Sequence, residues 1–412
     1  MTKIKYIKIH PAIGIARVGN AVSTQAPASD RDDFFIGPLV PGPVLPPTGG
    51  YKKDGRVKSQ AAQFRLFSYD HNDELIGEIT EEQAVIEWSV TLANTKAGWL
   101  QFNGLTPGPP RNPHILDKEQ RQKLNVTPAS KSLTGAAQGP AYFDDGTFSD
   151  VEAGTEKTVP VPLGEIFTDE TGHLLVLAAN GKSGSPFNTS IDHYANNPGW
   201  HDDLADGPVD AKVTLKSSGQ EVQVIGSWVV CTLPKYSPDL ENFLTLYDTL
   251  YDVAVLRKQL PAPKTTEFYQ DIVPFLRRLL QVRWTMGVGP AHDFLIQQAM
   301  QPEASSEVRH AVFDRLRSPK GSNVGLMNMP VLYDDNNNWQ RSGNAGLAIT
   351  TVQYDHLQRW AEGCYTVGEK PSEIEQDIPV TPDGMDRAAL EACCGGAFFP
   401  GMEVSWAMRD VY

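Results

Sequence analysis

The sequence has no surplus of positive charge, no long apolar run and few cysteines. It contains 36 Lys+Arg against 50 Asp+Glu in 412 residues, a formal net charge of −14. Nucleic acids and anionic membrane surfaces attract basic proteins, so neither is expected as a partner. No apolar stretch approaches the ~18 residues needed to cross a bilayer. The N-terminus has no apolar run followed by small residues, so we expect a cytoplasmic protein or one released without a classical signal peptide.

The four cysteines are too few for a disulfide scaffold. They are Cys231, Cys364, Cys393 and Cys394, and neither CxxC nor a Cys/His zinc spacing occurs among them. The adjacent pair leaves two alternatives open. The two sulfurs form a vicinal disulfide, or one thiol is buried while the other turns outward.

The distribution of strand and helix signals predicts an α+β protein. Residues 1–235 are expected to form a β-rich, sandwich-like domain with long loops, because short strand-like runs alternate there with Gly, Pro, Asn and Asp clusters. The expected strands are Lys5–His10, Gln63–Tyr69, Ala84–Leu92, His173–Ala178, Ala211–Leu215 and Val222–Val230. The Pro/Gly-rich Ile36–Gly50 and the stretch from about residue 103 to 154 are expected to be irregular.

Residues 236–412 are expected to form a helix-rich part. Apolar residues recur there at helical spacing. The expected helices are Asp239–Lys258, Gln270–Met286, Ala291–Gln301, Ser306–Arg317, Thr351–Gly363 and Asp386–Cys393.

Generic catalytic motifs are missing, since the sequence has no P-loop, GxGxxG, GxSxG or HExxH. A first local cluster, NNPGWHDDLADGPV, contains His201, Asp202, Asp203 and Asp206, with His193 just upstream. Such a cluster suits a divalent cation and metal-dependent hydrolysis. Asp and Asn beside Gly and Pro are also common turn formers, and this structural interpretation is the preferred one.

A second cluster lies near the end of the sequence, in DRAALEACCGGAFFPGMEVSW. Glu391 and Glu403 flank the Cys393-Cys394 pair, and negative charge nearby disfavours a reactive thiolate. No histidine is close in sequence to act as a base for the thiol. The pattern therefore disfavours cysteine-protease chemistry and suggests a covalent attachment point instead.

A series of segments, spread along nearly the whole chain, resembles one family. The segments include Ile9–Ala21, Phe34–Pro38, Lys53–Phe67, Leu92–Trp99, Pro162–Ser183, Asn196–Val209, Thr245–Ala254, Asp271–Arg278, Gln353–Gly363 and Asp386–Trp406. In number and order they resemble the lysine ε-oxidase/glycine oxidase group of amino-acid oxidases, which use cysteine tryptophylquinone.

The resemblance implies a quinone cofactor made from the protein's own side chains. In this family a cysteine sulfur is bonded to an oxygenated tryptophan, and a primary amine is oxidised with O₂ to give ammonia and H₂O₂. The Cys-x-Gly-Gly pattern places the sulfur at Cys393, with Cys394 as the alternative. The flanking residues Gly395, Gly396 and Trp406 belong to the same cofactor segment. The assisting carboxylate and base are expected among three residues, Asp386, Glu391 and Glu403.

One departure concerns the tryptophan. The family's quinone tryptophan lies several dozen residues beyond the cysteine, and none of the tryptophans at 88, 99, 200, 228, 284, 339, 360 and 406 has that position. The resemblance therefore implies a C-terminally incomplete chain, with the ring on a continuation or a second polypeptide. It also implies a flavoprotein maturation partner and is compatible with a homo-oligomer. The alternative is a cofactor-free member of the family that acts as a binding or partner protein.

Overall fold

The protein is described by a computed structural model. It covers residues 4–21, 31–43, 45–98, 111–192, 197–235, 237–283, 290–319, 329, 348–370 and 378–395. The chain divides into two compact units. The strand unit comprises Met1–Pro41, Pro46–Tyr236 and Val380–Ala389, and the helix unit comprises Gly42–Leu45, Ser237–Pro379 and Leu390–Tyr412.

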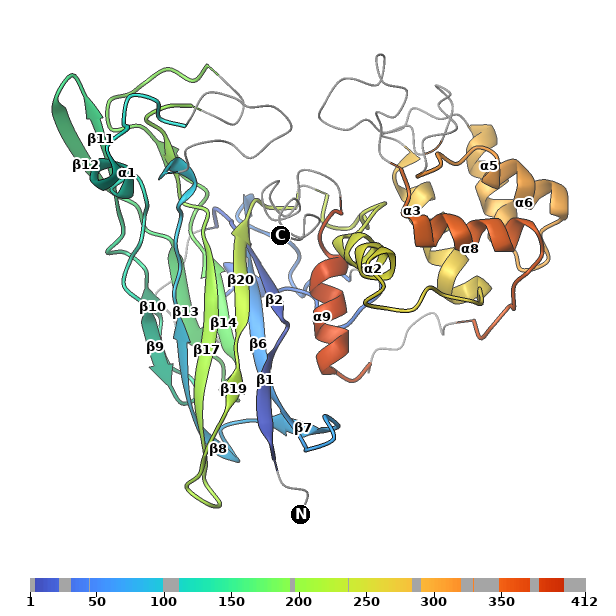
Figure 1. The fold of residues 1–412 in the computed structure, drawn as a ribbon, viewed down its shortest axis with the longest axis horizontal. Helices are drawn as coiled ribbons and strands as arrows, with labels where there is room; N and C mark the ends of the chain where they lie inside the picture. The colour runs from blue at the N-terminus through green and yellow to red at the C-terminus, as the bar shows by residue number, and fades with distance from the viewer. Residues whose placement is uncertain are drawn as a thin grey trace. The chain divides into compact units, whose positions relative to one another are not determined.

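A 14-stranded sheet forms the strand unit, and its long strands run side by side in Figure 1. The main path is β10-β13-β14-β6-β2-β20-β17-β8-β9, with β1, β3 and β7 on β6, β18 on β17 and β19 on β1. The strands are β1 Tyr6–His10, β2 Ile13–Arg17, β3 Phe34–Ile36, β6 Ser59–Tyr69, β7 Leu75–Ile79, β8 Ala84–Val90, β9 Lys131–Thr134, β10 Ala141–Tyr142, β13 Gly164–Thr168, β14 Leu174–Ala178, β17 Asp206–Leu215, β18 Glu221–Val222, β19 Val224–Ile225 and β20 Ser227–Thr232.

Smaller elements extend the strand unit. Its two-stranded hairpins are β4 Lys52–Lys53 with β5 Arg56–Val57, β11 Thr147–Glu152 with β12 Thr155–Pro160, and β15 Ser183–Gly184 with β16 His201–Asp202. Its short helices are η2 Lys96–Gly98 and α1 Lys118–Gln122.

Alternating side chains place one face of β8 in the core, whereas β6 and β14 are buried on both faces. In β8, Ile86, Trp88 and Val90 are buried while Val85 and Glu87 face outward. Such alternation is what a half-buried strand requires, because successive side chains point to opposite faces. The expected α+β class with a β-rich N-terminal part is confirmed.

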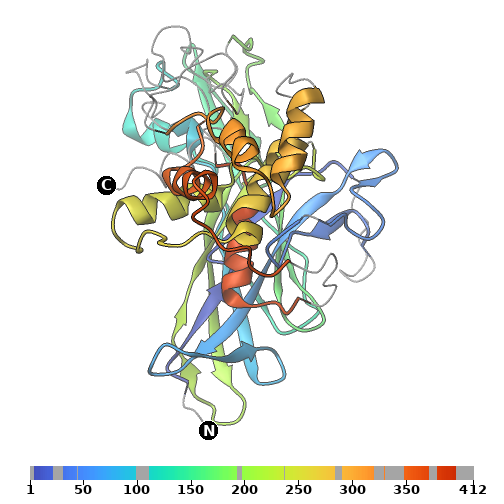
Figure 2. The ribbon, with the colours of Figure 1, turned by 90° about the vertical axis from the view of Figure 1, so that its right-hand side faces the viewer.

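Helix α9, Pro382–Glu391, begins in the strand unit although it lies late in the chain. Its Met385 is buried and clusters with Phe67 and Tyr69 of β6. Both views show α9 running beside the strands (Figure 1, Figure 2). The apolar contact with β6 therefore fixes the first turns of α9 on the sheet.

The helix unit is built from α2 Leu246–Leu256, η3 Phe268–Ile272, α3 Val273–Gln281, α5 Pro290–Ala299, α6 Ser306–Phe313, α8 Thr351–Ala361 and the last residues of α9. Phe275, Leu276 and Trp360 are fully buried in its core. Helix α8 starts at a capping box, in which Thr350 and Gln353 satisfy each other's backbone amides. None of the helices in the described ranges is both long and apolar enough to cross a membrane.

The expectation of an irregular segment between residues 103 and 154 is wrong in part. Its described residues include α1, β9, β10 and β11. The β11–β12 hairpin is mostly polar, with β12 exposed and Phe148 to Asp150 of β11 buried, and it turns at Ala153 and Gly154, both with positive φ. A polar hairpin carries no apolar alternation, so the sequence pattern could not reveal it.

Candidate functional site

The Cys393–Gly395 segment is fixed to the start of α2 by backbone hydrogen bonds. The amide of Leu246 donates to the carbonyl of Cys393 at 2.9 Å, and the amide of Gly395 donates to the carbonyl of Leu244 at 2.8 Å. Between these bonds, Cys394 forms an antiparallel bridge with Thr245. Residues 393–395, which follow α9, are therefore paired like a short strand with residues 244–246. We call residues 393–395 the cysteine frame.

Gly395 lies in tight contact with α2. Its carbonyl accepts the hydroxyl of Thr249 at 3.1 Å. A Cβ at this position would lie 2.2 Å from the carbonyl oxygen of Thr245 and 2.3 Å from the Thr249 hydroxyl. Real Cβ atoms do not approach oxygen that closely, so glycine is required here by close packing.

The start of α2 is itself rigid. Thr245 and Asp248 form a capping box, in which each side chain accepts a hydrogen bond from the other's backbone amide. Arg278 of α3 donates to the Asp248 carboxylate at 2.7 Å. The cysteine frame therefore rests on a helix terminus whose polar groups are satisfied and whose position is fixed by a second helix.

The two cysteines have different surroundings. Cys393 has 0% of its surface exposed, whereas Cys394 is partly exposed, and the structure has both as thiols. This agrees with the alternative of one buried and one outward thiol. Three further expected site residues, Gly396, Glu403 and Trp406, lie outside the described residues.

Asp386 makes its contacts within the strand unit. Its carboxylate accepts the backbone amide of Ala12 at 2.7 Å and lies 3.0 Å from Nδ1 of His10. The other ring nitrogen of His10, Nε2, is 3.1 Å from the hydroxyl of Tyr69. Asp386 is thus bound to strand β1 and to the turn that follows it, whereas Cys393 belongs to the helix unit.

Glu391, the last residue of α9, belongs to the same unit as Cys393. Its carboxylate accepts the backbone amide of Gly42 at 3.1 Å, and its carbonyl accepts the side-chain amide of Asn242 at 3.3 Å. Among the described carboxylates that the sequence singled out, Glu391 is therefore the one held together with the cysteine frame.

The acidic cluster around His201 has structural roles. Each acidic side chain accepts a hydrogen bond from a different group: Asp202 from the ammonium of Lys96, Asp203 from the amide of Lys182 and Asp206 from the indole of Trp228. Burial lowers the pKa of His201, whose ring lies 5.0 Å from that of Phe148. His193 lies outside the described residues, and within the described ranges no group of His, Cys, Asp and Glu is suited to hold a metal ion.

The sequence alone did not predict the capping of α2 or the contact that Asp386 of α9 makes with His10. The T-x-x-D pattern of Thr245 and Asp248 is a capping-box signature that could have located the start of α2. No local signal pairs His10 with Asp386, because 376 residues separate them.

Two models of one protein family match this chain. The family model described as L-lysine epsilon oxidase N-terminal matches residues 10–231, more than half of the chain. The model described as L-lysine epsilon oxidase C-terminal domain matches residues 330–412, which include the cysteine frame.

Individual relatives agree with the family models. L-lysine 6-oxidase from Marinomonas mediterranea is 26% identical over 98% of this chain, which spans 63% of that relative's length. Crystal structures of the L-Lys epsilon-oxidase from the same organism superpose with a TM-score of 0.73 at 24% identity and cover 98% of this chain and 66% of theirs. One of them captures a Schiff base intermediate with L-Lys. The chain therefore belongs to the L-lysine ε-oxidase family.

Proposed function

We propose that this chain takes part in the oxidative deamination of an amino acid. The reaction uses a primary amine and O₂, and it releases ammonia and H₂O₂ through a cysteine tryptophylquinone whose sulfur comes from Cys393. The observation that carries the proposal is the fully buried Cys393, held by the start of α2, in a chain of this family. An oxidase of this kind is expected to be a quinoprotein acting on CH–NH₂ groups with oxygen as acceptor.

The residues present suit this cofactor. A crosslink needs one sulfur at a fixed place, and Cys393 has its backbone carbonyl bonded to Leu246 and its side chain out of contact with solvent. Cys394 is partly exposed and is the less suitable donor of the sulfur. The indole belongs to a part of the protein outside the described residues.

The quinone would supply an electrophilic carbonyl for the amine and an acceptor for its electrons. The chain itself has to supply a base for the proton on the substrate carbon. We assign this role to Glu391, because its carboxylate lies in the unit that holds Cys393 and is oriented by the amide of Gly42. Asp386 is less suitable, since its carboxylate is bound to His10 and Ala12.

The relatives suggest the substrates and partners to test. L-lysine is the first candidate, because the similar protein from Marinomonas mediterranea is an L-lysine 6-oxidase. Glycine is the second candidate, on the resemblance of the sequence segments alone. The proposal also includes an indole on a continuation of the chain or on a second polypeptide, a flavoprotein for maturation and a homo-oligomeric assembly.

The test is an amine oxidation assay on protein purified from its native host. We expect H₂O₂ and ammonia in equal amounts with L-lysine or glycine, together with a visible quinone absorbance band. Cys393→Ser should abolish both signals, whereas Cys364→Ser, at an exposed thiol, should leave them unchanged. Absence of peroxide with every amino acid, in protein without the absorbance band, would overturn the proposal in favour of a binding function.

A further inference from the structure

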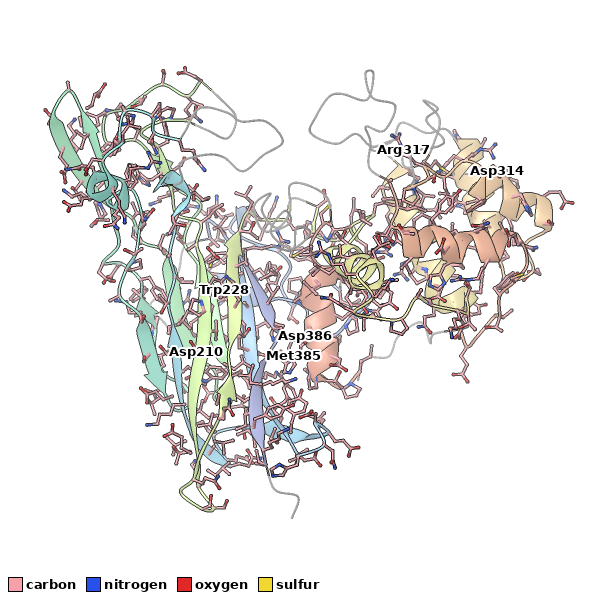
Figure 3. The ribbon with its side chains drawn as sticks, viewed as in Figure 1. Asp210, Trp228, Asp314, Arg317, Met385 and Asp386 are labelled. Carbon is pink, nitrogen blue, oxygen red and sulfur yellow. The ribbon has the colours of Figure 1, made fainter. Side chains whose placement is uncertain are left out.

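The strand unit contains a continuous series of hydrogen bonds that joins Tyr69, His10 and Asp386. The imidazole of His10 lies between the Tyr69 hydroxyl, 3.1 Å from Nε2, and both Asp386 oxygens, 3.0 and 3.1 Å from Nδ1. Figure 3 labels Asp386 and Met385 on α9, next to strand β1. His10 is 6% exposed and Tyr69 9%, so their hydrogen bond is removed from water, whereas the Asp386 side chain is 31% exposed.

The chemistry of the groups fixes the direction of the hydrogen bond to Asp386, and for a neutral imidazole the direction of the bond to Tyr69 follows from it. A carboxylate only accepts, so Nδ1 of His10 donates to Asp386. In that neutral imidazole Nε2 carries no proton, so it accepts a hydrogen bond that the Tyr69 hydroxyl donates. A second donor to Asp386, the amide of Ala12 at 2.7 Å, comes from the turn between β1 and β2.

This order of groups is that of a catalytic triad, but its surroundings favour a structural function. Burial, with Asp383 and Asp386 nearby, raises the pKa of Tyr69 to about 12, so the phenol keeps its proton. The ring of Tyr69 stacks on that of Tyr6 at 5.3 Å, and the ring of His10 meets Phe67 edge-on at 5.8 Å. A protonated, packed phenol is a poor nucleophile or base and a good anchor.

The anchor acts on the helix that leads to the cysteine frame. Asp386 lies in the middle of α9, and the helix ends at Glu391, two residues before Cys393. The first turns of α9 belong to the strand unit and its last residues to the helix unit. A movement of α9 at Asp386 would therefore also displace Cys393, because only a short, continuous stretch of chain joins the two residues.

We propose that His10 is a positioning residue for the cofactor cysteine: with Tyr69 it clamps Asp386, and thereby holds α9 in the place from which Cys393 is presented for crosslinking. This inference rests on the proposed function. It assigns to Asp386 a role in fixing the helix and leaves the base to Glu391.

The test compares two amides at position 10. The side-chain nitrogen of asparagine overlays Nδ1 of histidine, whereas that of glutamine overlays Nε2. His10→Asn therefore keeps the donor to Asp386, and His10→Gln removes it. Tyr69→Phe removes one hydroxyl and keeps the packed ring, so it remains informative even where a change at position 10 impairs folding. His71→Gln, at an exposed histidine, is the matched control.

Two readouts are measured at matched global stability. Amide hydrogen exchange over residues 383–392 is expected to rise roughly tenfold or more in His10→Gln and to stay within about threefold of wild type in His10→Asn. The crosslinked fraction of Cys393, measured by mass, should fall strongly in His10→Gln. It should fall by a similar, smaller amount in Tyr69→Phe and His10→Asn, because both variants keep the donor to Asp386 and lose only the hydrogen bond between Tyr69 and position 10. The control should match wild type in both.

The outcomes separate the clamp from the proposed function. Wild-type protein without any crosslink would refute the proposed function, while the exchange measurement would still test the clamp. A crosslinked wild type whose His10→Gln variant retains both exchange protection and crosslink yield would refute the clamp. Loss of both in His10→Asn as well would also refute it, because the position would then require a histidine for another reason.

Discussion

The Gly395→Ala variant adds a methyl group where the cysteine frame has no room for one. The new Cβ would lie 2.2 Å from the carbonyl oxygen of Thr245 and 2.3 Å from the hydroxyl of Thr249. The first neighbour is backbone at the start of α2 and cannot rotate away. Relief therefore needs a shift of about 1 Å between Gly395 and α2, since ordinary contacts begin near 3.4 Å.

The magnitude follows from two contributions. Overpacking of one methyl group destabilises by about 1–3 kcal/mol. A 1 Å shift would also break the hydrogen bond from the Gly395 amide to Leu244, which contributes about 1 kcal/mol. We expect the local opening of the cysteine frame to become easier by about 2–4 kcal/mol.

The assay is hydrogen exchange at the amides of Leu246 and Gly395 together with the crosslinked fraction of Cys393. Exchange should accelerate by more than tenfold, and the crosslinked fraction should fall. Gly219→Ala is the control, because that glycine has a φ of +67° and open space at its Cβ position, so it reports backbone strain without crowding. If Gly395→Ala matched wild type in both measurements, the account of the frame would be wrong.

Two further predictions concern titration and thiol reactivity. Although burial opposes its charge, hydrogen bonds to Asp169 and Glu78 raise the pKa of His173, and His173 in turn helps to lower the pKa of Asp169 to about 2. The contribution of His173 to the free energy of unfolding should be complete below about pH 6.5 and be lost as the pH rises through its raised pKa, whereas the contribution of Asp169 is lost as the pH falls toward 2. In His173→Gln, the denaturant midpoint of unfolding should lose its dependence on pH in the higher range. An unchanged pH profile would refute the assignment. Burial raises the pKa of the Cys231 thiol to about 12, so at pH 8 a thiol reagent should modify the exposed Cys364 and leave Cys231 unmodified until the protein unfolds; equal rates would contradict this.

Much of the secondary structure could be predicted from local pattern. The helix expected from Thr351 begins at that residue, because Thr350 and Gln353 carry the capping signal in the sequence itself. The strand expected at Ala84 also begins there, since apolar residues alternate along it. Signals of this kind act over a few residues and survive folding into any tertiary arrangement.

The contacts that define the site could not be predicted in the same way. Asp386 and Glu391 lie seven and two residues before Cys393 in the same short segment, yet one is bound to His10 and the other to Gly42. Their partners differ because the first turns of α9 pack against the sheet, and no periodicity in the sequence predicts that long-range contact. The requirement for glycine at Gly395 likewise depends on the Thr245 carbonyl, which is 150 residues away in sequence.

Peptide mass spectrometry can identify the cysteine that carries the cofactor sulfur. Protein purified from its native host is reduced, alkylated and digested. We expect Cys394 to be alkylated and Cys393 to be protected and linked to an oxygenated tryptophan. An alkylated Cys393 without a linked tryptophan, in protein that oxidises an amino acid, would contradict this expectation.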